Sequence, residues 1–279
     1  MNDLIIGCSF NYQWDILKYW CTSLSRCGFE GKKVLFVTGA TKETIDKIHH
    51  CGIDIVTLGV DEAGNSISSK TNLAPHVERF VHLYEFLLQD QYRYVVTTDV
   101  KDVIFQKNPI EWLEKNIGDK QYVFSSESLK YKDEPWGNTN LFETFGPYFH
   151  ERFKDNEIFN VGVLAGKGAS ITSLCANIFV SSINKPIPIC DQSTFNFMIS
   201  QEPYLGASVY TRSEDGWACQ LGTTADPSKM KQFKPFLLEN SPKLVGDKVF
   251  TDSGKEFTIV HQYDRIPGWK EIIEKKYSL

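Results

Sequence analysis

The stretch Tyr92–Pro109, YRYVVTTDVKDVIFQKNP, most constrains what this chain can fold into. It opens with an apolar, β-branched run through Val95 and Val96, which predicts a strand buried on both faces of a sheet. The run ends at two acids, Asp99 and Asp102. Carboxylates just past the C-terminal end of a central strand lie where open α/β sheets bind their ligands. We therefore expect these acids at a site rather than in a core.

The spacing of the two acids limits how they can be used. In a straight strand, residues three apart point to opposite faces and lie about 10 Å apart. At that separation the two carboxylates could not share one cation, whose bonds to oxygen are about 2.1–2.5 Å long. Either the chain turns between Asp99 and Asp102, or one acid contacts a metal ion while the other binds a hydroxyl or a water. The alternative is that Asp99 caps a turn and Asp102 is solvated.

The rest of the chain predicts an α/β fold with a mostly parallel central sheet flanked by helices. Strands are expected at 4–8, 34–37, 53–58, 94–96, 122–125 and 159–166. They alternate with helices expected at 14–27, 42–50, 77–88 and 169–182, a pattern typical of a doubly wound sheet. Near the C-terminus, residues 249–260 predict a β-hairpin turning at 252–254, followed by a helix over 269–277. The length of 279 residues fits one domain.

Composition excludes several functional classes. Lys and Arg total 30 against 35 Asp and Glu, a net charge of -5, and without a basic cluster we expect no binding to nucleic acid. The seven cysteines are odd in number and lack metal-ligand spacing, so we expect reduced thiols and a cytoplasmic location. No stretch approaches the ~18 apolar residues of a membrane span, so no transmembrane anchor is expected. No GxGxxG follows the first strand, which argues against a dinucleotide cofactor.

Further candidate residues follow along the chain. Asn160 and Gly162 interrupt an apolar strand, and a glycine within a strand often marks a close backbone approach. Asp191 and Gln192 precede an apolar helix, so Asp191 is either its N-cap or a site residue. His261 comes at a strand end, where a structural role is the alternative to metal binding. The aromatic segment 129–153 is either a small satellite core or a flap over an acceptor glycan.

In this order, the motifs resemble those of nucleotide-sugar glycosyltransferases of the GT-A type. The acidic pair resembles that family's Asp-any-Asp motif with one residue more, and residues 159–166 resemble its Asn-Ala-Gly motif. Residues 191–196 resemble the Asp-Gln motif. His261 with Pro267 and Trp269 resembles the closing motif of one GT-A group, although the Gly and Lys that the family has between them are absent and Arg265 would replace the Lys.

The resemblance implies a single GT-A (Rossmann-like) domain over 1–279, with a nucleotide-binding half (1–125) and a donor-sugar and acceptor-binding half (126–279). It implies a metal ion, Mn²⁺ or Mg²⁺, held by Asp102, His261 and Asp99. The residues implied to contact the donor are Arg79, Lys70, Asp99, Asn160 and Gly162. Those implied at the reacting sugar are Asp191 and Gln192, with Asp191, Asp215 or Glu214 as the base if configuration inverts.

The implied activity is metal-dependent transfer of a hexose or pentose from a nucleotide-sugar, a UDP-sugar, to a hydroxyl of a glycan acceptor. The chain also resembles bacterial and large-DNA-virus transferases, including those that build the capsid glycans of algal viruses. On that ground UDP-xylose is the expected donor. Two alternatives are a non-catalytic sugar- or nucleotide-binding protein of this fold and a sugar nucleotidyltransferase. The latter would need a Gly-rich, Arg-containing loop where this chain has Cys8, Ser9 and Phe10.

Overall fold

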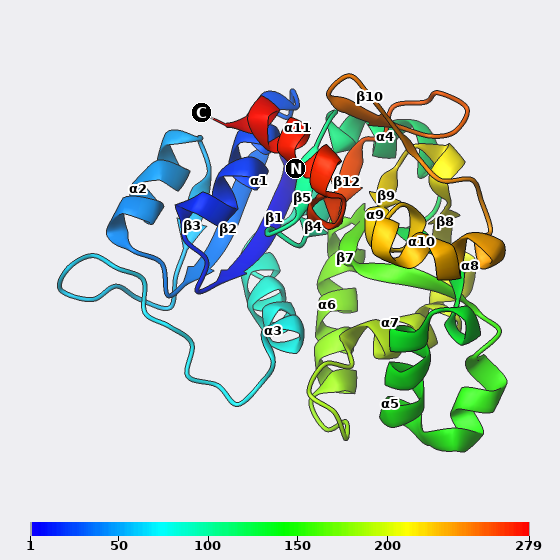
Figure 1. Ribbon diagram of the computed structural model, residues 1–279. Helices are drawn as coiled ribbons and strands as arrows, with labels where there is room; N and C mark the ends of the chain where they lie inside the picture. Colours follow the sequence, from blue (N-terminus) through cyan, green and yellow to red (C-terminus); the bar gives the residue numbers. More distant parts are fainter. Residues whose placement is uncertain (1, 279) are drawn as a thin grey trace.

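The computed structural model describes residues 2–278 and is built on a seven-stranded sheet of order β3-β2-β1-β4-β7-β6-β8 (Figure 1). Its strands are β1 (Asn2–Phe10), β2 (Lys32–Thr38), β3 (Asp54–Val56), β4 (Tyr92–Thr98), β6 (Tyr122–Lys130), β7 (Glu157–Lys167) and β8 (Ser208–Thr211). β7 runs antiparallel to β4 and β6, and the other neighbouring pairs are parallel. The predicted α/β class with a mostly parallel central sheet is confirmed.

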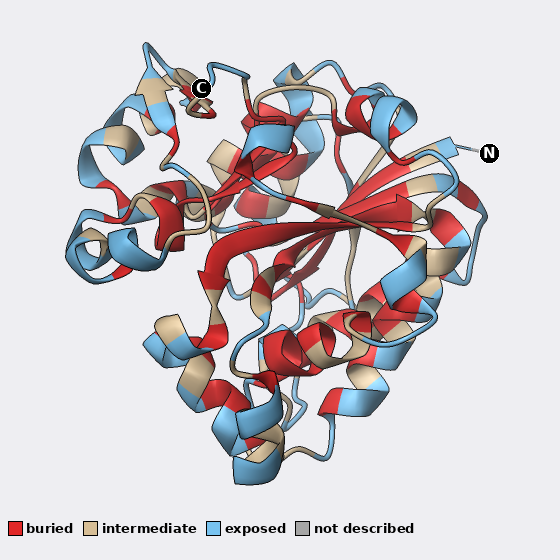
Figure 2. Cartoon of the chain, turned by 90° about the vertical axis from the view of Figure 1, so that its right-hand side faces the viewer, coloured by how far each residue is buried: buried red, intermediate tan, exposed pale blue. Residues whose placement is uncertain are grey.

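Two cores, one on each face of the sheet, take alternate side chains of the inner strands. Ile5 of β1 packs in one core with Leu17 of α1 (Trp14–Arg26). Its neighbour Leu4 packs in the other with Phe80 of α3 (Pro75–Leu87) and Ile171 of α6 (Gly168–Ser182). This division follows because successive strand residues point to opposite faces. Figure 2 shows the buried strands with the exposed outer faces of the helices around them.

Eight further α-helices lie in the described chain. They are α2 (Lys42–His50), α4 (Pro109–Asn116), α5 (Pro135–Phe153), α7 (Asp191–Ile199), α8 (Tyr204–Ala207), α9 (Leu221–Thr224), α10 (Pro227–Phe233) and α11 (Pro267–Tyr277). The sequence reasoning missed α4, although its start carries a helix signal. Asn108 Oδ1 accepts from the Ile110 amide at 3.0 Å, and Pro109 occupies the first turn.

A second sheet of three strands, in the order β5-β12-β9, follows the C-terminal end of β4. Its strands are β5 (Val103–Phe105), β9 (Ala218–Gln220) and β12 (Ile259–His261). β12 pairs antiparallel with β5 and parallel with β9. This sheet brings the end of the chain next to the acids that follow β4.

The predicted hairpin over 249–260 is only partly right. Its turn forms, with the Thr251 amide donating to the Lys255 carbonyl at 2.8 Å. However, β11 (Lys248–Phe250) pairs with β10 (Lys243–Val245), and the segment that follows leaves to form β12. Burial explains the departure, because Ile259 and Val260 are fully buried between β5 and β9.

The aromatic segment forms η1 (Tyr131–Asp133) and α5, which bends at Gly146 (φ 78°) just before Pro147. Its inner side chains make a small core, so the satellite-core interpretation holds for them: Tyr131, Leu141, Phe145, Phe149 and Phe153, with Ile158 and Phe197. Trp136, Phe142 and Tyr148 instead face solvent. Among residues 2–278, no helix has the length and apolarity to cross a membrane.

Candidate active site

The chain turns between Asp99 and Asp102, as a shared site requires. β4 ends at Thr98, whose Oγ1 accepts from Trp20 Nε1 at 2.9 Å. The Asp99 amide then donates to the Gly162 carbonyl of β7 at 2.7 Å, and bends follow before β5 begins at Val103. Both carboxylates consequently face the same space.

β12 brings His261 to the two acids. Its register pairs His261 with Val103 of β5 and with Gln220 of β9. Gln220 Oε1 accepts from His261 Nδ1 at 2.7 Å, while Gln220 Nε2 donates to Ser125 Oγ at 2.8 Å. An amide oxygen can only accept, so Nδ1 carries a proton and Nε2 is left to face the acids.

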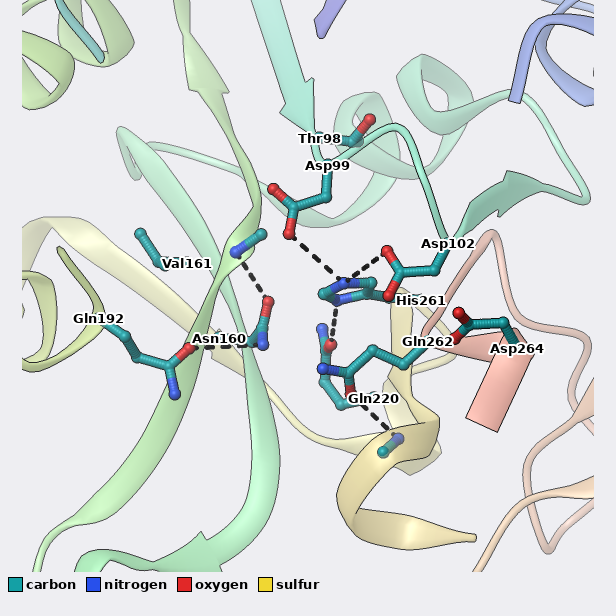
Figure 3. Close-up of polar contacts among 12 residues, drawn as sticks. Thr98, Asp99, Asp102, Asn160, Val161, Gln192, Gln220, His261, Gln262 and Asp264 are labelled. Atoms are coloured by element: carbon teal, nitrogen blue, oxygen red, sulfur yellow. Dashed lines mark hydrogen bonds and ion pairs between the residues drawn. The ribbon is translucent and has the colours of Figure 1, made fainter. Parts of the chain in front are cut away.

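We call Asp99, Asp102 and His261 the metal group. His261 Nε2 lies 3.6 Å from Asp99 Oδ2 and 3.5 Å from Asp102 Oδ1 (Figure 3). One ligand atom from each residue lies within 4.8 Å of the others. Two carboxylates and an imidazole at these separations can share one divalent cation, and the contact to Gln220 is the outer hydrogen bond that ligating histidines usually make. The residues therefore fit a metal ion.

Charge keeps the buried Asp102 carboxyl ionised. Burial raises its pKa, but the charge and hydrogen bond of His261, together with Arg265 and Lys101, outweigh burial and hold the pKa below its usual value. Arg265 Nη2 lies 3.9 Å from Asp102 Oδ2 and is half exposed at the cavity. An ionised carboxylate is the form that binds a metal ion.

Gly162 forms the wall behind the metal group. A Cβ at this position would lie 2.6 Å from Asp99 Oδ2, 2.7 Å from the His261 ring and 2.9 Å from Asn160 Oδ1. Its amide donates to Asn160 Oδ1 at 2.7 Å. The glycine is needed because any side chain here would collide with Asp99, His261 and Asn160.

Arg79 links the metal group to α7. Its guanidinium pairs with Asp99 through a short contact and with Asp191 Oδ2 at 3.1 Å. Asp191 is the first residue of α7, and its side chain does not cap the helix, so the N-cap interpretation is wrong. The reason is electrostatic, since the Asp191 carboxylate pairs with the Arg79 guanidinium, whose side chain is only 12% exposed.

A buried carboxyl and two amides form a second cluster, which we call the amide row: Glu127, Asn160 and Gln192. Glu127 Oε1 accepts from Asn160 Nδ2 at 2.7 Å and from Gln192 Nε2 at 3.2 Å. Asn160 Nδ2 also lies 3.5 Å from Gln192 Oε1 (Figure 3). The sequence reasoning assigned Asn160 and Gln192 to the site but not Glu127, because the predicted strand stopped at 125 whereas β6 continues to Lys130.

These groups line one cavity of about 530 Å³, a volume suited to a small-molecule ligand. Arg265 and Lys229 supply positive charge at its wall, and Trp136 and Ile189 supply apolar surface. The structure brings together most of the predicted site residues. Those that line the cavity are Arg79, Asp99, Asp102, Asn160, Gly162, Asp191, Gln192 and His261.

Three predicted residues lie elsewhere. Lys70 is exposed in the loop before α3 and does not line the cavity. Asp215 lies in η2 (Ser213–Asp215), where its Oδ2 accepts from the Arg212 amide at 2.8 Å. Glu214 bonds to Ser253 on the surface. Asp215 is held by its own turn and Glu214 by Ser253, and neither acid lines the cavity.

Gln220 was also not predicted from the sequence, because only the register of β9 against β12 places it beside His261.

No family model matches the chain, and no curated protein does. Among solved structures, an active-site variant of LgtC is 14% identical, with a TM-score of 0.49, and the match covers 93% of this chain and 86% of that one. LgtC, a galactosyltransferase, in complex with donor and acceptor sugar analogues, is 15% identical, with a TM-score of 0.47 and the same coverage.

The glycosyltransferase GlyE of Streptococcus pneumoniae TIGR4 is 14% identical, with a TM-score of 0.47; the match covers 99% of this chain and 63% of that one. All three of these structures are glycosyltransferases or variants of one.

Proposed function

We propose that this protein is a metal-dependent glycosyltransferase of the GT-A type that moves a sugar from a nucleotide-sugar to a hydroxyl of a glycan. The observation that carries the proposal is the metal group, which combines two carboxylates with an imidazole nitrogen turned toward them. It lies in the same cavity as the other motifs of the resemblance. A structural histidine would not need two acids from the turn between β4 and β5 at its free nitrogen.

The chain's residues divide between the two ends of the donor. Asp99, Asp102 and His261 would hold the metal ion, and a bound divalent ion supplies positive charge against the departing diphosphate. A mixed oxygen and nitrogen ligand set suits Mn²⁺ at least as well as Mg²⁺. Arg265 and Lys229 line the cavity and can bind phosphate oxygens. The nucleotide therefore belongs to the half of the cavity that holds the metal group.

The transferred sugar belongs beside α7 and β7. Arg79 holds the Asp191 carboxylate in one orientation at the cavity, and Asn160 holds the Gln192 amide. Hydrogen-bonding groups that are fixed before substrate arrives stabilise a developing charge without reorganising. Asp191 and Gln192 are thus suited to face the sugar ring as the bond to the diphosphate breaks.

The acceptor enters over α5. Trp136 lines the cavity with about half of its surface exposed, close to the first turn of the helix. An exposed indole offers a flat apolar face with a polar edge, and a sugar ring packs well on such a face. A glycan acceptor is therefore the class that this end of the cavity favours. For the donor we propose UDP, with xylose as the first sugar to assay.

Release of UDP from UDP-xylose, UDP-glucose and UDP-galactose, measured with Mn²⁺, Mg²⁺ or EDTA, tests the proposal. We expect slow release to water with Mn²⁺, faster release when a suitable glycoside is added, and none with EDTA. Binding of UDP without release in any mixture would instead indicate the non-catalytic binding protein. Formation of a UDP-sugar from UTP and a sugar 1-phosphate would indicate the nucleotidyltransferase.

A further inference from the structure

The side-chain amide of Gln192 could lie either way round in the cavity. Gln192 is the second residue of α7, and its backbone carbonyl accepts from Asn196 Nδ2 at 2.8 Å, which fixes the main chain at this point. The terminal torsion of a glutamine side chain is broad and roughly two-fold, so the helix does not decide which end of the amide points where. That choice depends on the side chains that Gln192 contacts.

The backbone fixes the neighbouring amide, that of Asn160. The Gly162 amide can only donate, and it donates to Asn160 Oδ1 at 2.7 Å. Asn160 Nδ2 therefore points the other way, toward Glu127 Oε1 at 2.7 Å and Gln192 Oε1 at 3.5 Å (Figure 3). Nδ2 carries two hydrogens, one for each of these acceptors. Asn160 thus turns the oxygen of Gln192 toward itself, but across a long contact.

Glu127 supplies the shorter contact to Gln192. Its Oε1 accepts from Gln192 Nε2 at 3.2 Å as well as from Asn160 Nδ2. If the Gln192 amide were turned over, its oxygen would face the oxygen of Glu127 and its nitrogen would face the nitrogen of Asn160, so both contacts would be lost. Asn160 and Glu127 together therefore allow one orientation of the Gln192 amide.

The fold holds Glu127 rigidly enough to set this orientation. The register of β6 against β7 shifts on either side of Ser126, and Ser128 adopts a left-handed conformation (φ 57°). Irregularities of this kind often redirect a side chain beside an active site. Thr223 Oγ1 of α9 donates to the Glu127 carbonyl at 2.8 Å, and only 5% of Glu127 is exposed. The carboxyl is therefore a fixed support beneath Gln192 rather than a mobile surface group.

We propose that Glu127 is a positioning residue that orients the Gln192 amide for the transferred sugar, which rests on the function proposed above. A group that meets a reacting sugar is effective only if it is already oriented, and a misplacement of about 1 Å can cost on the order of 10²-fold in rate. Glu127 neither gives nor takes a proton in this role. Its Oε1 accepts from both amides whether the carboxyl is ionised or carries a proton on Oε2.

Two replacements of Glu127 separate positioning from proton transfer. The measurement is kcat for UDP release with Mn²⁺ from UDP-xylose, UDP-glucose or UDP-galactose. Glu127→Gln keeps an oxygen that can accept from both amides, so kcat should stay within about threefold of wild type. Glu127→Met has a similar length but no acceptor, and kcat should fall by about 10–100-fold while the midpoint of the UDP titration stays within about threefold. Glu85→Met, an exposed change on α3, is the matched control and should behave as wild type.

A double variant shows whether Glu127 acts through Gln192. Gln192→Ala should itself lower kcat by at least about tenfold. Adding Glu127→Met to it should lower kcat by less than about threefold more, because the amide that Glu127 orients is gone. Glu127→Asp keeps the carboxyl but withdraws it by one methylene, and kcat should fall by about tenfold. If the methionine variant does not fold, Glu127→Asp takes its place in both comparisons.

Three results would overturn the proposal. They are equal losses of kcat in Glu127→Gln and Glu127→Met, a wild-type kcat in Glu127→Asp, and losses that multiply in the double variant. Melting temperatures measured beside the rates show which variants are folded. If the wild-type protein releases no UDP from any of the three donors, the proposed function itself fails, and the role of Glu127 with it.

Discussion

The metal group and the amide row hold buried carboxylates in opposite ways. In the metal group, Asp102 is kept ionised by His261 and Arg265. In the amide row, the Glu127 side chain accepts hydrogen bonds from the neutral amides of Asn160 and Gln192, and burial raises its pKa to about 7. A carboxyl group is thus kept ionised at Asp102 and titrates near neutral pH at Glu127, although both residues line the same cavity. Neighbouring charge, rather than burial alone, decides which behaviour results.

The largest effect should come from removing a charge of the metal group. Asp102→Asn keeps the shape of the side chain but loses a negative ligand, so we expect metal-dependent UDP release to fall by about 10³-fold or more. The assay is UDP release at saturating Mn²⁺. Asp119→Asn, an exposed change outside the cavity, is the control. Unchanged UDP release by Asp102→Asn would show that the metal group does not bind the metal ion on which the reaction depends.

Asp191→Asn tests whether the pair with Arg79 serves the sugar. We expect turnover to fall by about 10²-fold, because a group fixed toward the reacting sugar loses its charge. UDP affinity should change by less than about threefold, since the nucleotide lies at the metal group. Titration of UDP beside measurement of kcat separates the two, and equal losses in both would show that Asp191 only supports the fold.

The contact between Gln220 and His261 should have an intermediate effect. Gln220→Ala removes the acceptor that fixes His261 Nδ1, and loss of such an outer contact typically weakens metal affinity by about 10–100-fold. Gln220→Glu keeps an acceptor at the same place and should retain tighter binding than the alanine variant. Mn²⁺ titration followed by calorimetry in the presence of UDP measures both. Equal affinity in the two variants would mean that the ring is held by β12 alone.

The last effect is on stability rather than on activity or binding, and it concerns the amide row. Folded Glu127 holds its proton up to about pH 7, whereas the unfolded chain releases it near pH 4.5. Unfolding therefore releases a proton between these values, and stability falls as pH rises through this window, by on the order of 3 kcal/mol.

Glu127→Gln cannot titrate and should lack this loss. Its melting temperature should exceed that of wild type at pH 8 and converge with it below pH 4.5. Because Glu134 and His261 also influence Glu127, the comparison is made between the two proteins at each pH. Parallel Tm curves across this range would show that Glu127 keeps an ordinary pKa.

The two regions also differ in how far the sequence predicts them. Asp99, Asp102 and His261 could be predicted because acids after a buried strand and a late histidine follow a recognisable order. Glu127 also follows a predicted strand, at 122–125, but it belongs to none of the motifs, and its place in the cavity depends on the continuation of β6 to Lys130. β6 continues past residue 125 because polar side chains find partners, including Ser126 Oγ with Glu157 Oε1 at 2.5 Å.

Asp215 shows the limit of local pattern. Like Asp99, it follows a strand and looks suited to a site, yet its carboxylate bonds to the amide of its own turn. The difference lies in what surrounds the strand end. β4 is central and lies between β1 and β7, whereas β8 is at the edge of the sheet. Strand order is set by long-range pairing, which residue patterns do not reveal.

We propose that the metal group binds a nucleotide diphosphate through a divalent ion. Thermal unfolding of the wild-type protein and of Asp102→Asn, each with UDP and Mn²⁺ or EDTA, tests it most directly, because a ligand bound only to the folded state raises its stability. At UDP near 100 times its Kd, we predict about 2.7 kcal/mol of stabilisation for wild type with Mn²⁺. EDTA or the Asp102→Asn change should abolish it. Stabilisation by UDP that persists under both conditions, or none in wild type, would contradict the account.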